Sequence, residues 1–109
     1  MSKNLLSPVV VMVILLTTPA QAGGIEVLRG KFAFNWLNDP AKGKCVKVEG
    51  KLLNDFKSTR YHCDLKTNLN SSSGASNRTC TQIPRNKEYL IFDTKRECND
   101  ERETQATNE

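Results

Sequence analysis

The sequence predicts a small α+β domain stapled by two disulfides, with one helix, then a three-stranded antiparallel meander, then a polar C-terminal helix. Three observations indicate this fold class. Four cysteines are spaced almost evenly, one stretch carries apolar residues at helical intervals, and three later stretches have strand-like composition with turn sequences between them.

Residues 1–22 have the order of a secretory signal peptide. Lys3 precedes an apolar run over residues 9–16, and the small-residue triplet Ala20-Gln21-Ala22 follows. The run is far shorter than the roughly 20 residues that a helix needs to cross a bilayer, so we expect cleavage rather than anchoring. Removal of residues 1–22 would leave a single domain, residues 23–109, and would lower the net charge from +4 to +3. We expect this domain in a bacterial periplasm or medium, without stable membrane insertion.

All four cysteines lie in the part that is expected to be exported. An even number of cysteines in a short exported chain is typical of a disulfide framework formed in an oxidising compartment. Zinc is the alternative, but the spacings of 18, 17 and 18 residues contain no Cys-x-x-Cys pair. We therefore expect neither a metal nor a cofactor.

The first half of the domain supplies apolar segments. Residues 25–37 fit both strand and helix periodicity, so their type stays open, as does the exposure of Trp36. Residues 46–57 place Val48, Leu53 and Phe56 on one face of a predicted helix. Gly50 should weaken that helix by about 1 kcal/mol relative to alanine.

Three stretches predict the meander: residues 61–66, 78–83 and 88–93. The loop over residues 67–77 centres near residue 72, so residues whose numbers sum to about 143 should face each other. Cys63 and Cys80 satisfy this sum, and opposed residues in an antiparallel pair are close enough for a disulfide. Cys45 then pairs with Cys98 by elimination.

The C-terminal segment begins with Thr94-Lys95-Arg96-Glu97, which matches a capping box and predicts a helix from Thr94. Residues 99–109 contain almost no apolar side chain. Cys98 is therefore the expected anchor of this helix.

Charge is unevenly distributed. Residues 42–60 carry six cations and two acids, whereas residues 93–109 carry six acids and three cations. A Cys45–Cys98 bridge would bring the two segments together, so the tail should neutralise part of the basic surface. Phe56 is the only aromatic residue among the cations, so no nucleic-acid site is expected, because such sites stack bases on aromatic rings. The modest net charge also argues against a membrane-active toxin.

One enzymatic alternative uses His62, the single histidine. A small secreted hydrolase would use it as general base, and the expected architecture resembles microbial ribonucleases in outline. Its other candidate residues are Asp64 or Glu88 as carboxylate partner and Arg78 for developing negative charge. The preferred interpretation is that His62 is a solvent-facing strand residue beside the buried Cys63.

The leading hypothesis is a non-enzymatic exported module that binds another envelope or secreted macromolecule, as an inhibitor of a secreted enzyme or as an accessory factor. Loops on rigid scaffolds concentrate binding residues. The candidates lie in the polar loop and the basic segment: Asn70, Ser72, Ser73, Asn77, Lys44 and Lys51. Asn70 and Asn77 also begin glycosylation patterns, which matter only in a eukaryotic secretory pathway.

Overall fold

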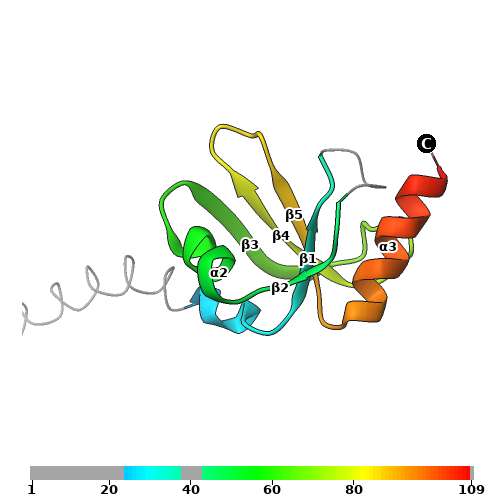
Figure 1. Cartoon of the computed structure of the whole chain (residues 1–109), viewed down its shortest axis with the longest axis horizontal. Coiled ribbons are helices and arrows are strands. Elements are labelled where there is room, and N and C mark those ends of the chain that lie inside the picture. Colours follow the sequence, from blue (N-terminus) through cyan, green and yellow to red (C-terminus); the bar gives the residue numbers. More distant parts are fainter. Residues whose placement is uncertain (1–23, 38–42, 109) are drawn as a thin grey trace, which may run out of the picture.

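The computed structural model describes residues 24–37 and 43–108, and it places a five-stranded antiparallel sheet between helical elements (Figure 1). The predicted signal peptide lies outside the described residues. Within the described residues, no helix is long and apolar enough to cross a membrane. In chain order the elements are η2 (Ile25–Leu28), β1 (Phe32–Asn35), β2 (Val46–Lys47), α2 (Gly50–Lys57), β3 (Tyr61–Asn68), β4 (Asn77–Gln82), β5 (Glu88–Phe92) and α3 (Lys95–Thr107).

The sheet has the strand order β2-β1-β5-β4-β3, so the predicted three-stranded meander undercounts it. The meander itself, β3-β4-β5, is present. The open segment 25–37 forms a 3₁₀ turn and then β1, which pairs along β5 with Phe34 opposite Leu90. Val46, which the sequence assigned to a helix, pairs with Ala33 instead. β5 thereby lies inside the sheet with a strand on each side, which satisfies its backbone groups on both edges.

Helix α2 begins at Gly50, four residues later than predicted. Gly50 has φ +53°, a left-handed conformation that glycine adopts without strain. The expected cost of a glycine inside the helix therefore does not apply, because Gly50 starts the helix. The predicted apolar face is confirmed in part: Leu53 and Phe56 are buried and Leu52 is partly buried, whereas Val48 is buried in the segment before the helix.

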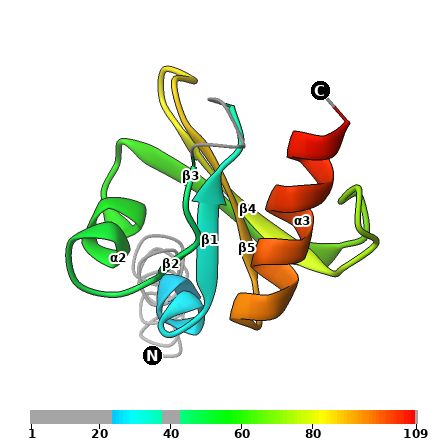
Figure 2. The same ribbon diagram turned by 45° about the vertical axis from the view of Figure 1, so that its right-hand side comes forward.

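Each face of the sheet has its own apolar core. One core lies under η2 and α2 and includes Ile25, Phe56 and Ile91. The other lies under α3 and includes Phe34 and Phe92. Figure 2 shows α2 and α3 on opposite sides of the strands. Side chains alternate between the faces along a strand, so β1 and β5 each contribute to both cores.

The structure contains the two predicted cystines. Cys63 and Cys80 face each other across β3 and β4 with their α-carbons 4.0 Å apart. The predicted register holds from His62 to Asp64, and it then shifts so that Asn68 faces Asn77. Cys45 bonds Cys98, with α-carbons 6.1 Å apart, and joins α3 to the segment before β2.

Helix α3 starts as its capping sequence predicts. The Thr94 hydroxyl oxygen accepts a hydrogen bond from the Glu97 backbone N–H at 3.1 Å. Cys98 is fully buried, and Glu101 one turn later is fully buried as well. The disulfide is therefore not the sole anchor of the helix.

Candidate ligand-binding hollow

A hollow of about 690 Å³ opens between α3 and the sheet, which is within the 300–1,000 Å³ range common for ligand sites. The end of β1 and strand β5 form one side, the β3–β4 loop forms another, and the second half of α3 closes it. In both ribbon views the yellow-green loop lies beside α3 (Figures 1 and 2). The lining residues are Trp36, Leu37, Asn68, Asn70, Ser71, Ser72, Asn77, Thr79, Glu88, Leu90, Glu101, Gln105 and Asn108.

Trp36 is held in place by Glu88. The indole Nε1 donates to Glu88 Oε1 at 2.9 Å, and the backbone N–H of Trp36 donates to the Glu88 carbonyl at 3.0 Å. The Arg85 guanidinium also lies over the indole, 5.9 Å from the ring centroid. The ring therefore presents a fixed aromatic wall at the hollow.

The Glu88 carboxylate is ionised and has a structural role. Burial raises the pKa of its carboxyl, but hydrogen bonds from Thr81, Arg85 and Trp36 outweigh this and hold the pKa below its usual value. A general acid at neutral pH needs a raised pKa. Glu88 is therefore ionised, with most of its acceptor sites occupied.

Glu101 fixes the loop to α3. Its carboxylate accepts from the backbone N–H groups of Ser72 at 3.0 Å and Ser73 at 2.7 Å, and from Gln105 Nε2 at 2.6 Å. Burial raises the pKa of this carboxyl, and these donors outweigh the effect and lower it. The sequence prediction missed Glu101, although its position three residues after Cys98 places both on one helix face.

Asn77 has an unpaired acceptor at the base of the hollow. Its side chain is 3% exposed, and its Nδ2 makes a long hydrogen bond of 3.4 Å to the Arg78 carbonyl. Its Oδ1 has no partner. A buried polar atom without a partner is costly, so Asn77 would gain stability from a hydrogen-bond donor. This burial also makes the Asn77 glycosylation pattern inaccessible in the fold.

The predicted binding residues lie in several separate places. Asn70, Ser72 and Asn77 line the hollow, whereas Ser73 borders a shallower depression beside α3. Lys51 is on α2, across the sheet, with 87% of its side chain exposed. Lys44 is exposed next to Cys45 and does not line the hollow. The polar loop and the basic segment therefore do not form one site.

The enzymatic alternative is not assembled in the described part of the chain. His62 faces Thr81, and Thr81 faces Glu88, so two strand spacings, about 10 Å, separate His62 from Glu88. Asp64 is an exposed residue two positions along β3 from His62, on the same face. The Arg78 side chain lies on the other face, where its Nε donates to the Leu65 carbonyl at 2.8 Å. A general base and its partner need hydrogen-bond distance, and in the described part of the chain no hydrogen bond joins His62 to Asp64 or Glu88.

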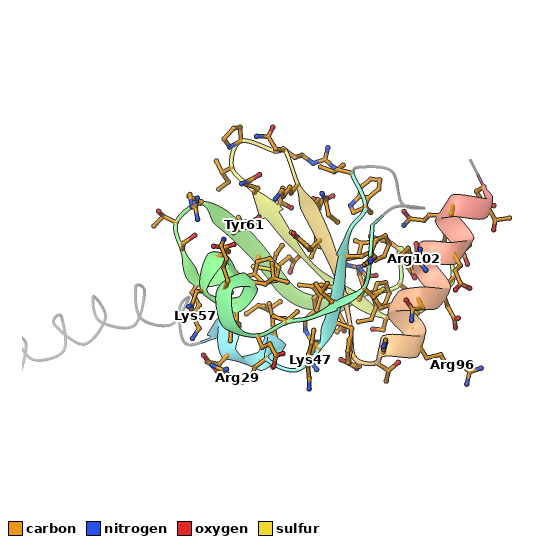
Figure 3. The ribbon with its side chains drawn as sticks, in the orientation of Figure 1. Arg29, Lys47, Lys57, Tyr61, Arg96 and Arg102 are labelled. Atoms are coloured by element: carbon orange, nitrogen blue, oxygen red, sulfur yellow. A yellow bond between two sulfur atoms is a disulfide. The ribbon has the colours of Figure 1, made fainter. Side chains whose placement is uncertain are left out.

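Three cations of the basic segment pair with nearby acids rather than with the tail. Glu26 binds Arg29 and Lys57, and Asp55 binds Lys51 and Arg60. Hydrogen bonds from Arg29 and Lys57 lower the pKa of Glu26 to about 2. Arg29 and Lys57 lie at the η2 end of the molecule, whereas Arg96 on α3 projects away at the far end (Figure 3). Over residues 44–60 and 95–107, no ion pair links the two segments, so the predicted neutralisation by the tail is wrong.

No protein-family model, curated protein or solved structure matches the chain. The hollow is therefore the feature of the molecule that bears on its function.

Proposed function

We propose that this chain is an exported, non-enzymatic binding module whose ligand site is the hollow between α3 and the sheet. The observation that carries the proposal is a hollow lined both by the fixed indole of Trp36 and by Asn77, whose buried Oδ1 has no hydrogen-bond partner. A site with a buried acceptor and a fixed aromatic ring suits selective binding.

The rigidity of the walls supports this role. Glu101 holds the loop through two backbone N–H groups, and the Cys45–Cys98 bridge holds α3. A preorganised site loses less conformational entropy when it binds. A cystine scaffold also suits an oxidising compartment outside the cytosol, where envelope and secreted macromolecules are available as partners.

The concave shape bears on the type of partner. An inhibitor that blocks an enzyme's active site usually presents a protruding segment, whereas a hollow receives a group from its partner. Accordingly, the module holds part of an envelope or secreted macromolecule. The concave shape favours a role as an accessory binding factor over a role as an inhibitor of a secreted enzyme.

Site-specific photocrosslinking tests the position of the site. A benzophenone side chain is placed at Asn70, on the rim of the hollow, or at Asn54, which is exposed on α2 across the sheet. Each protein is irradiated in envelope and medium fractions of the producing cell. We expect a discrete, saturable adduct from position 70 and only background from position 54.

Equal labelling at the two positions would contradict the proposal, because the reaction would then report random contacts. A matched sample with Asn77→Ala added to the position-70 protein should lose most of the adduct. If that adduct persists unchanged, the hollow is not the site.

A further inference from the structure

We propose that the hollow binds a neutral carbohydrate unit of a glycan, with Trp36 stacking on the sugar and Asn77 accepting one of its hydroxyls. This inference rests on the proposed function and adds the chemical class of the ligand. Three properties of the lining lead to it: its charge, the occupied state of its carboxylates, and its combination of one aromatic wall with many neutral polar groups.

The lining is poor in charge although the chain is rich in it. Charged residues make up 26% of the sequence, and Lys and Arg outnumber Asp and Glu by 16 to 12. None of the thirteen lining residues is a cation, and eight are neutral amides or hydroxyls. Phosphate, carboxylate and nucleic-acid ligands need Arg, Lys or clustered N–H donors, so an anionic ligand does not fit.

The two carboxylates in the lining do not make a strong cation site. Glu88 accepts from Trp36, Arg85 and Thr81, and Arg85 neutralises its charge. Glu101 accepts three hydrogen bonds from the loop and from Gln105. A carboxylate has about four acceptor sites, so each has room for about one further donor. One free acceptor site suits a hydroxyl better than an ammonium group with three donors.

A sugar ring matches the remaining features. It has an apolar face of C–H groups and an edge of hydroxyls, each of which both donates and accepts. The C–H face can pack on the Trp36 indole and on Leu90. A hydroxyl can donate to Asn77 Oδ1 once the amide, which is held only by a 3.4 Å hydrogen bond from its Nδ2, rotates toward the hollow. Asn70, Ser72 and Asn108 lie around the rim, where amides and hydroxyls can exchange hydrogen bonds with neighbouring units.

The protein carries its own reporter for the test, because Trp36 is its only tryptophan. The oxidised chain is titrated with maltotetraose, cellotetraose and tetra-N-acetylchitotetraose, and Trp36 emission is followed. A peptide of alternating glycine and lysine and inorganic phosphate are titrated in parallel. We expect a saturable shift in emission with at least one tetrasaccharide and none with the peptide or phosphate.

Three alanine variants locate the binding. Asn77→Ala removes the buried acceptor, and Asn70→Ala removes an exposed rim amide whose loss should not disturb the fold. Each should weaken sugar binding about tenfold, the effect of one lost hydrogen bond to a buried or oriented partner. Asn54→Ala, the matched control on α2, should bind like the parent. Thermal unfolding curves establish that all three variants are folded.

Different failures can be distinguished. A saturable shift with the lysine peptide and none with the sugars would overturn the carbohydrate assignment, while the crosslink at position 70 would still support the hollow as a binding site. Sugar binding that neither Asn70→Ala nor Asn77→Ala weakens would place the sugar elsewhere and would also overturn the inference. No response to any sugar, together with equal crosslinking at positions 54 and 70, would remove both proposals.

Discussion

Glu101 contributes more to the architecture of the hollow than its place in a polar tail suggests. It is a buried carboxylate, and such a group is tolerated only when its charge is well hydrogen-bonded. Its two backbone donors, Ser72 and Ser73, belong to a loop whose apolar contact with the core under α3 is the small side chain of Ala75. The Glu101 carboxylate thus adds hydrogen bonds to a limited hydrophobic contact between the loop and α3.

The substitution Glu101→Gln should destabilise the protein by about 1–3 kcal/mol. The neutral amide offers one oxygen where the carboxylate offered two, so one of the two loop N–H groups loses its charge-assisted acceptor. Urea unfolding followed by circular dichroism measures the change. Glu103→Gln is the matched control, because that side chain is on the same helix and 68% exposed, and it should change stability little.

The same carboxylate predicts a pH dependence. Because its folded-state pKa lies below the unfolded value, its stabilisation is complete above the pKa of an ordinary glutamate, about 4.3. The stabilisation is lost as the pH falls from the pKa of an ordinary glutamate through the lower pKa that Glu101 has in the folded protein. Between pH 7 and pH 3, the Glu101→Gln variant should therefore lose less stability than the parent. An equal loss in both proteins would show that Glu101 is not bonded as described.

Gly50 provides a second prediction for a single residue. Its φ of +53° is unfavourable for alanine, and no atom lies within 4 Å of an added Cβ, so the effect of Gly50→Ala is a backbone effect alone. We expect a loss of about 1–2 kcal/mol in the free energy of unfolding, measured by thermal or urea denaturation. Gly50→Asn should lose less, because asparagine tolerates this conformation. A stabilising effect of alanine would contradict the observed start of α2.

At the scale of elements, α3 depends on few contacts. It buries Cys98 and Glu101, and its remaining residues are partly buried or exposed. A helix with so little buried surface is held in place by specific links rather than by general packing. Its two links, the disulfide and the carboxylate, are on neighbouring turns of the same face.

Removal of the two disulfides should therefore have different local effects. In the chain-entropy model, Cys45→Ala with Cys98→Ala costs about 4 kcal/mol, and Cys63→Ala with Cys80→Ala about 3 kcal/mol. Hydrogen exchange should show early loss of protection in α3 for the first pair of substitutions. For the second pair, α3 should keep its protection relative to β4 and β5. Identical exchange patterns would contradict this division.

The sequence contains enough local information to predict the meander, the register around Cys63, both cystines and the cap of α3. These depend on neighbouring strands, turn position and capping residues. The pairing of Phe32 with Phe92 depends on contacts 60 residues apart, which periodicity does not report. Of the residues that line the hollow, the sequence predicts only Asn70, Ser72 and Asn77 as binding candidates. Glu101 was missed because a charged residue in a polar segment has no burial signal.

At the scale of the whole molecule, the two faces of the sheet have different roles. The face under η2 and α2 contains the larger core, with Phe56, Tyr61 and Tyr89 in mutual edge or tilted contact. The face under α3 is only partly covered, and the uncovered part forms the hollow. One layer of strands thus separates the larger core from the hollow, so changes at exposed lining residues such as Asn70 should be tolerated better than changes in the larger core.

The connectivity of the cystines also affects how the chain withstands proteases. The bridge from Cys45 to Cys98 spans most of the sheet, and the bridge from Cys63 to Cys80 lies inside that span. A single peptide-bond cleavage between these outer cysteines, including one in the exposed β3–β4 loop, leaves the two pieces covalently joined. The severed strands stay at high effective concentration and can remain paired. A molecule exposed to extracellular proteases could thus be nicked in its polar loop and still persist as one folded unit.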